Sequence, residues 1–248
     1  MLGNFLLDAL EPDDLARLRP HLSPVELKAG DIIYSPGDEV AQVWFPLGGL
    51  LSILSVLIDG TQVESSVVGR ESAVGFVEAC GGGVSHSLII SQMSGRALRA
   101  PAARYREAFN ESVQLRKAVN QHIELLLAEA RQEIACHGAH QAPARLARWL
   151  LVCLDKAGSS EIQMTQEFLA TMVAAQRTTI SAIASQMQAD GLIRYVRGKI
   201  AIRDAAGLER RACECYATMK HFRRVLGQPG AGPARAGLEA AEQAVSRP

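Results

Sequence analysis

No glycine or proline interrupts the chain between Tyr105 and His137. Within this stretch, positions separated by alternating steps of four and three residues form a stripe that is apolar for most of its length, the pattern of a heptad seam. We predict a helix over residues 109–138 and expect it to join two copies of the chain, because the stripe is too narrow for a core of its own. Asn120, on the same stripe, would fix the register of the pair. The expected dimer interface comprises Phe109, Val113, Ile123, Leu127, Ala130 and Ile134. The alternative is a helix packed on its own domain's surface.

The residues before this helix have the pattern of a β-domain. From Val25 to about Arg99, short apolar runs are bounded by turn-forming pairs. The pair Asp59-Gly60 separates LLSILSVLI from TQVESSVV, which indicates a hairpin. Many short strands at this spacing favour a sandwich or jelly roll, so we predict a sensor-type β-domain over residues 1–108.

The residues after the helix predict a second domain, over 139–215. Helical patterns at 143–156, 165–173 and 176–189 precede a strand, a tight turn at Arg197-Gly198 and another strand. Two helices joined by a short link and followed by a hairpin are typical of a winged helix-turn-helix. The last segment, 216–248, is predicted to be a largely disordered extension because Gly227–Pro248 is rich in Gly, Pro and Ala.

The charges are distributed in a way that favours a polyanion as the partner of the second domain. The whole chain has 26 basic and 26 acidic residues, but residues 141–226 carry 13 basic against 7 acidic ones. The second helix of the expected helix-turn-helix starts with Arg-Thr-Thr, whose guanidinium can read a guanine while the hydroxyls reach phosphates or base edges. The expected DNA-binding residues are Thr165, Gln166, Gln176, Arg177, Thr178, Thr179, Ser181, Arg197 and Lys199.

Five segments resemble the Crp/Fnr family of bacterial regulators. They are LKAGDIIYSPGD, VWFPLGGLLSIL, IDGTQVESSVVGRESAVG, CHGAHQAPARLARWLL and TQEFLATMVAAQRTTISAIASQMQADGLIRYVRGKIAI, and the resemblance covers about residues 4–212. It implies an α+β chain with a cyclic-nucleotide-binding-like jelly roll, a dimerisation helix and a winged helix-turn-helix. It also implies a homodimer on palindromic double-stranded DNA, with RNA polymerase as a further partner.

Within this resemblance, Arg177 occupies the position that reads guanine, and Thr165 and Gln166 occupy positions that contact phosphate. The turn glycine usual in the family is Ala174 here. Thr178 and Ala182 stand where the best-known members carry a charged partner, so we expect a different target half-site.

The residues expected at the effector pocket differ from those of relatives that bind cyclic AMP. Alignment on Gly75 puts Phe76 in place of the glutamate that holds the ribose, and His86-Ser87 in place of the Arg-Ser pair that holds the phosphate. A phenyl ring cannot accept a hydrogen bond, and histidine is a poor bidentate phosphate clamp. We therefore expect no ordinary control by cyclic AMP. An unidentified small ligand at Gly75, Phe76, Cys80, His86 and Ser87, or thiol redox through this domain, remains the alternative.

The five cysteines do not form a disulfide framework or a recognisable cofactor motif. The chain up to Ala79 has no cysteine, which excludes an N-terminal iron–sulfur cluster. Cys136, His137 and His140 could be metal ligands, but such residues more often pack or cap a helix end. Cys213 and Cys215 are expected on different faces of a helix. We therefore predict no metal site and no cofactor.

An enzyme is not expected either. His86 is the only histidine between Leu22 and His122, so a cupin-like metal centre cannot form. The longest apolar run, from Leu47 to Ile58, is too short to span a bilayer. The N-terminus has no secretory signal, so we expect a cytoplasmic protein without a membrane partner.

Overall fold

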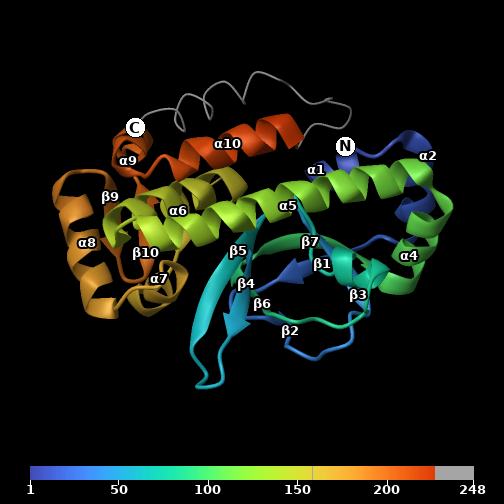
Figure 1. Cartoon of the computed structure of the whole chain (residues 1–248), viewed down its shortest axis with the longest axis horizontal. Coiled ribbons are helices and arrows are strands. Elements are labelled where there is room, and N and C mark those ends of the chain that lie inside the picture. The colour runs from blue at the N-terminus through green and yellow to red at the C-terminus, as the bar shows by residue number, and fades with distance from the viewer. Residues whose placement is uncertain (158, 227–248) are drawn as a thin grey trace, which may run out of the picture.

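A computed structural model describes residues 1–157 and 159–226 (Figure 1). The chain opens with two short helices and a 3-10 turn that pack at one end of the N-terminal domain: α1 (Phe5–Asp8), α2 (Pro12–Leu18) and η1 (Arg19–His21). None of the described helices combines the length and the apolar character needed to cross a bilayer.

Two antiparallel sheets form the body of the N-terminal domain. One has the order β1-β7-β3, and the other has the order β2-β6-β4-β5. Leu57 and Thr61 close the β4–β5 hairpin through a backbone hydrogen bond, so the predicted turn at Asp59-Gly60 is confirmed. The bounds are β1 (Ser23–Leu27), β2 (Ile32–Tyr34), β3 (Gln42–Pro46), β4 (Leu50–Val56), β5 (Gln62–Val68), the short helix α3 (Phe76–Cys80), β6 (Leu88–Met93) and β7 (Gly95–Pro101).

The long helical stretch contains a break, which corrects the expected helix over 109–138. Helix α4 (Ala102–Glu111) ends before Ser112, and helix α5 (Val113–Ala139) begins after it. Ser112 is extended, with φ −104° and ψ 120°, and its hydroxyl accepts a hydrogen bond from the backbone N–H of Leu115 at 3.0 Å. Serine is a favourable N-cap, so the break has a local cause. Phe109 therefore belongs to α4, where it packs against the core of the N-terminal domain.

The C-terminal domain has the predicted helix-turn-helix and hairpin around one apolar core. A short strand that the sequence did not reveal, β8, completes a sheet of order β8-β10-β9. The elements are α6 (Ala142–Ala157), β8 (Glu161–Gln163), α7 (Gln166–Met172), α8 (Arg177–Ala189), β9 (Ile193–Val196), β10 (Lys199–Ile202) and α9 (Ala205–Arg211).

The expected disordered extension over 216–248 begins instead with a helix. Helix α10 (Cys215–Leu226) packs along α5 (Figure 1), and Tyr216 and Met219 on it are buried. Residues 227–248 lie outside the described part of the chain. Cys213 precedes α10 in a turn, so Cys213 and Cys215 are not on different faces of one helix, as expected from the sequence, and their thiols lie together.

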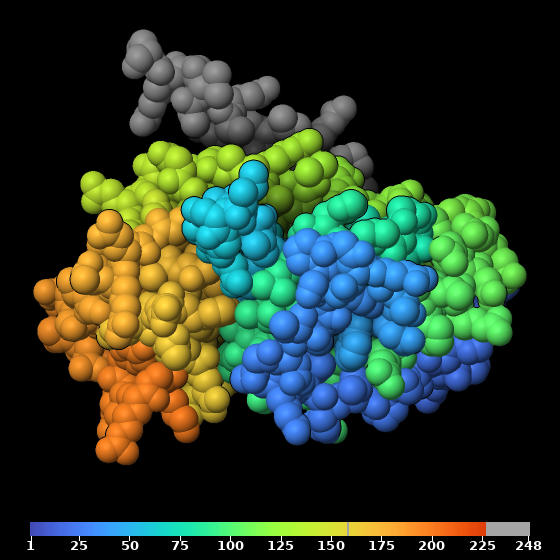
Figure 2. Space-filling view, turned by 90° about the horizontal axis from the view of Figure 1, so that it is seen from below, coloured from blue at the N-terminus to red at the C-terminus, as the bar shows by residue number. Residues whose placement is uncertain are grey.

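The two domains share packing as well as a connecting helix. Leu50, Leu54 and Val67 of the β4–β5 hairpin lie in the same apolar cluster as the residues of α6. The tip of this hairpin projects between the two domains when the molecule is seen from below (Figure 2). The indole N–H of Trp149, on α6, donates a hydrogen bond to Oε1 of Glu64, on β5, at 2.6 Å.

Burial raises the pKa of Glu64 to about 8, although hydrogen bonds from Ser52 and Trp149 oppose the shift. This carboxyl is therefore neutral in the folded protein at pH values where it is ionised in the unfolded chain. Because the folded state holds the proton more tightly, Glu64 supports stability below its unfolded pKa, and this contribution is lost as the pH rises through about 8.

We predict that Glu64→Gln, which keeps the acceptor for Trp149, removes this pH dependence. Relative to the variant, the wild type should lose up to about 1.4 kcal/mol of unfolding free energy per pH unit between pH 5 and 8. Urea unfolding of both proteins across this range measures the difference. Parallel pH profiles would show that Glu64 does not titrate as proposed.

Candidate nucleic-acid interface

Helices α7 and α8 meet at a tight turn that is set by local capping and one strained residue. The side chain of Thr165 N-caps α7 by accepting a hydrogen bond from the backbone N–H of Phe168 at 3.2 Å. Ala174 has a φ of +47°, a left-handed conformation that costs a non-glycine residue about 1–2 kcal/mol. Ala174 therefore replaces the family's usual glycine at a position whose backbone conformation favours glycine.

Arg145 holds this turn against the end of α5. Its guanidinium donates to the carbonyl oxygen of His140 at 2.6 Å and to that of Val173 at 2.8 Å. The first carbonyl belongs to the α5–α6 junction, and the second belongs to the turn of the helix-turn-helix. One side chain thus fixes the helix pair relative to the long helix.

The first turn of α8 is presented to solvent. The side chains of Gln176, Arg177, Thr178 and Thr179 are exposed. Ser181 is half-buried, and its hydroxyl donates to Oε1 of Gln166 at 2.6 Å, so these two predicted DNA-binding residues link α7 to α8.

The β9–β10 hairpin lies beside the start of α8. Arg197 and Gly198 at its tip both have positive φ, +49° and +76°, as a two-residue hairpin turn of type I′ requires. The side chains of Arg197 and Lys199 are exposed, and neither they nor Arg177 form a salt bridge within residues 1–157 and 159–226.

A hollow of about 340 Å³ separates the start of α8 from the hairpin tip. It is lined by four of the predicted DNA-binding residues, Thr165, Gln166, Arg177 and Arg197. Tyr195, which was not predicted from the sequence, also lines it. Tyr195 lies in a strand, and its hydroxyl donates to the carbonyl of Met164 at 3.0 Å. Two unpaired guanidinium groups and backbone N–H groups at a helix start suit a phosphate.

Only part of the apolar stripe predicted to form the dimer interface is buried within the monomer. Val113, Leu127 and Ile134 remain 66%, 47% and 74% exposed, and Ala130 is half-buried. Ile123, like Phe109, packs against the N-terminal core. A different face of α5 is buried within the monomer: Leu115, Val119, His122, Leu125, Glu129 and Cys136.

The five residues expected at an effector pocket have different environments. Phe76 is 2% exposed in the core of the N-terminal domain, and its ring centroid lies 5.6 Å from that of His122. His86 is exposed, whereas Cys80 and Ser87 are half-buried. Gly75 caps α3 with φ +80°, and an added Cβ would approach the carbonyl oxygen of Gln42 to 2.8 Å.

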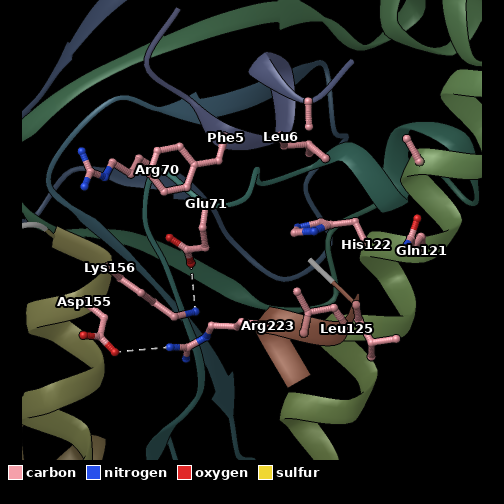
Figure 3. Close-up of a pocket in the computed structure, with 13 residues that line it drawn as sticks. Phe5, Leu6, Arg70, Glu71, Gln121, His122, Leu125, Asp155, Lys156 and Arg223 are labelled. Atoms are coloured by element: carbon pink, nitrogen blue, oxygen red, sulfur yellow. Dashed lines mark ion pairs between the residues drawn. The ribbon is translucent and has the colours of Figure 1, made fainter. Parts of the chain in front are cut away.

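A cavity of about 280 Å³ lies elsewhere, where both domains meet α5 and α10. Figure 3 shows that its walls are partly apolar and partly ionic, with Lys156 paired to Glu71 at 2.9 Å and Arg223 paired to Asp155 at 3.6 Å. The guanidinium of Arg70 lies over the ring of Phe5, 4.8 Å from its centroid, and makes no salt bridge with any described residue. Burial lowers the pKa of His122, which favours its neutral form.

The chain matches two families of domains. Residues 24–112 match the cyclic nucleotide-binding domain, and residues 144–211 match the Crp-like helix-turn-helix domain. A relative described as a CRP-like cAMP-activated global transcriptional regulator, from Mycobacterium tuberculosis, is 22% identical over 214 residues, which cover 84% of this chain and 96% of the relative.

Solved structures of similar fold include two regulators. FixK2 from Bradyrhizobium japonicum superposes with a TM-score of 0.67 at 15% identity, covering 77% of this chain and 98% of that one. A CRP/FNR-family transcriptional regulator from Thermus thermophilus superposes with a TM-score of 0.62 at 25% identity, again covering 77% and 98%.

Proposed function

The chain belongs to the Crp/Fnr family of DNA-binding transcription regulators, and from this premise we propose that it is a homodimer that reads a palindromic site with the helix starting at Arg177. The observation that carries the proposal is the exposed start of α8, where Arg177 faces the hairpin tip across a hollow. RNA polymerase is the protein partner that follows from a role at promoters, and no enzymatic activity is part of the proposal.

The interface divides into a part that reads bases and a part that holds the backbone. Arg177 stands at the first turn of α8, where its planar fork can meet O6 and N7 of a guanine in the major groove. Lys199 and Arg197, on the exposed hairpin, would contact phosphates beside the groove. Thr165, Gln166, Gln176, Thr178, Thr179 and Ser181 complete the proposed contact surface.

We predict that Arg177→Ala weakens specific binding much more than non-specific binding. Loss of a bidentate contact to guanine costs about 1–3 kcal/mol of discrimination, and a dimer loses it twice. Lys199→Ala should weaken binding to all DNA sequences alike. It should also reduce the slope of log K against log[salt] by about one unit for each phosphate contact removed. Competition gel shifts at graded salt, on half-sites with centres about 34 Å apart, measure both effects.

Arg104→Ala is the matched control, because it removes an exposed arginine from α4, in the N-terminal domain. It should change neither specificity nor salt dependence. An equal loss of affinity for specific and random DNA in Arg177→Ala would show that Arg177 contacts only phosphate, and would refute its role as a base reader.

Dimerisation through α5 is supported by the apolar side chains that the monomer leaves exposed. Val113, Asn120, Leu127 and Ile134 follow one another at intervals of seven residues, and all four are exposed. Exposed leucine and isoleucine at heptad spacing gain burial when a second helix packs against them. Asn120 would set the register of the two helices.

We predict that the double substitution Leu127→Glu with Ile134→Glu yields a monomer. Four carboxylates would then face one another across the two-fold axis without partners, at a cost that the remaining apolar contacts cannot offset. Light scattering reports the mass, and the monomer should bind the palindrome weakly. Ala135→Glu, at an exposed position beside the stripe, should leave the dimer intact. A dimer of unchanged mass in the double variant would contradict the assignment.

Independence from cyclic AMP is the second part of the proposal, although the Mycobacterium tuberculosis relative is described as activated by it. Phe76 fills the apolar core at the position where the ribose-binding glutamate is expected. His86 and Ser87 offer no guanidinium for a cyclic phosphate.

We predict that isothermal titration with cyclic AMP gives no binding in the micromolar range. The physical reason is that a ribose hydroxyl would lose its water partners without gaining an acceptor from Phe76. Titration of the Phe76→Glu variant, which places a carboxylate acceptor at this position, measures whether binding of cyclic AMP is gained. A micromolar or tighter site in the wild type would refute this part of the proposal.

A regulator gated by another small ligand is the second candidate, and the interdomain cavity favours it (Figure 3). The cavity offers apolar walls and the guanidinium of Arg70, which suits a small molecule with an apolar body and an anionic group. Gating by thiol redox in the N-terminal domain has less support, because burial raises the pKa of Cys80 to about 11. Native mass spectrometry, which detects co-purifying small molecules, distinguishes ligand gating from ligand-free regulation.

A further inference from the structure

Four potential metal ligands converge where α5 ends and α10 begins. They are Cys136, His140, Cys213 and Cys215, and their ligand atoms all lie within 4.8 Å of one another. The three thiols are buried, with exposures of 0%, 7% and 1% in that order. Segments more than 70 residues apart in the sequence bring them together, so the cluster is a product of the fold and not of one local motif.

The spacing of the four atoms fits one tetrahedral ion. Metal–ligand distances of about 2.3 Å for sulfur and about 2.0–2.1 Å for nitrogen give tetrahedral edges of about 3.8 Å between sulfurs and about 3.5 Å between sulfur and nitrogen. The sulfurs of Cys136 and Cys213 lie 3.5 Å apart, and the sulfur of Cys215 lies 3.6 Å from Nδ1 of His140. Small movements of side chains would therefore complete the coordination.

The neighbours of the four ligands are those that a metal site requires. Nε2 of His140, the nitrogen that faces away from the sulfurs, lies 3.0 Å from a carboxylate oxygen of Glu214. A carboxylate in this position fixes the histidine tautomer and increases the basicity of the other ring nitrogen. The amide of Gln132 donates to the sulfur of Cys215 at 3.1 Å, which would stabilise a thiolate.

We propose that Cys136, His140, Cys213 and Cys215 form a structural site for one Zn²⁺ ion. Three thiolates and one imidazole in a closed tetrahedral set are typical of structural zinc, and thiolate-rich sites select soft or borderline cations over Mg²⁺ and Ca²⁺. Binding releases the three thiol protons to solvent, and neither the ion nor the sulfurs change oxidation state. No metal site was expected from the sequence, because residues such as Cys136 and His140 at the end of a helix more often pack or cap it, and because Cys213 and Cys215 were expected on different faces of a helix.

The ion would join the end of α5 to the α9–α10 turn and the start of α10, in addition to the packing and the Arg223–Glu129 ion pair between α5 and α10. Cys136 lies in the last turn of α5, His140 is its C-cap, and Cys213 and Cys215 mark the α9–α10 turn and the start of α10. The site would therefore fix the end of the C-terminal domain to the long helix.

The test is the zinc content of the full-length protein, purified under reducing conditions and dialysed against a zinc buffer. Elemental analysis should give one zinc per chain for the wild type and for Cys80→Ser, the control with a thiol outside the cluster. The double variant Cys213→Ser with Cys215→Ser should lose at least nine-tenths of the metal. His140→Gln, at a half-buried position, should bind zinc at least tenfold more weakly without removing a buried thiol.

A second measurement does not depend on the folding of a variant. A strong chelator added to the wild type should release the zinc, expose three further thiols to a colorimetric reagent and lower the melting temperature. Wild type without zinc, with all five thiols free, would overturn the proposal. A Cys136–Cys213 disulfide that persists when zinc is offered would also overturn it, in favour of a redox pair. Iron with inorganic sulfide would overturn the assignment to a single ion.

Discussion

The ammonium group of Lys156 is shielded from water at the end of α6, where it contacts groups from three other parts of the chain. It donates to the carbonyl of Val67 at 2.6 Å and pairs with Glu71 at 2.9 Å and with Glu129 at 3.5 Å. Glu71 raises the pKa of Lys156 against the effect of burial, so the group stays charged. A buried charge that loses a partner costs about 3–5 kcal/mol, and α6 therefore cannot leave the N-terminal domain and α5 without that penalty.

The same cluster of charges links α5 and α6 to α10. The carboxylate of Glu129, on α5, pairs with Lys156 of α6 and with Arg223 of α10. The Nε of Arg223 lies 2.5 Å from Oε1 of Glu129. Lys156 and Arg223 also line the interdomain cavity, together with Glu71 and Asp155 (Figure 3). A ligand in that cavity would act directly on the contacts that hold the two domains together, which is the differential interaction that any allosteric ligand needs.

The sequence predicted the elements that rest on local patterns, and it failed where distant residues decide. The helix-turn-helix and the Asp59-Gly60 hairpin follow from periodicity and turn chemistry, and Ala174, which departs from the family's usual glycine, has a left-handed φ of +47°. The break in the long helix at Ser112 was not predicted, because a serine N-cap is a weaker sequence signal than Gly or Pro. The contacts of Lys156 with Val67 and Glu71 and the convergence of Cys136 with Cys213 span 77 or more residues and have no sequence signature.

These tertiary contacts bear on how DNA would be read. In a two-fold dimer joined through α5, the distance between the two reading helices depends on the angle between α5 and the helix-turn-helix of each chain. Arg145 sets this angle by binding the carbonyls of His140 and Val173, and the proposed zinc site holds the imidazole of the same His140. Both restraints therefore act on one junction residue. In the proposed dimer, a change in either would alter half-site spacing without touching the proposed base-reading side chain of Arg177.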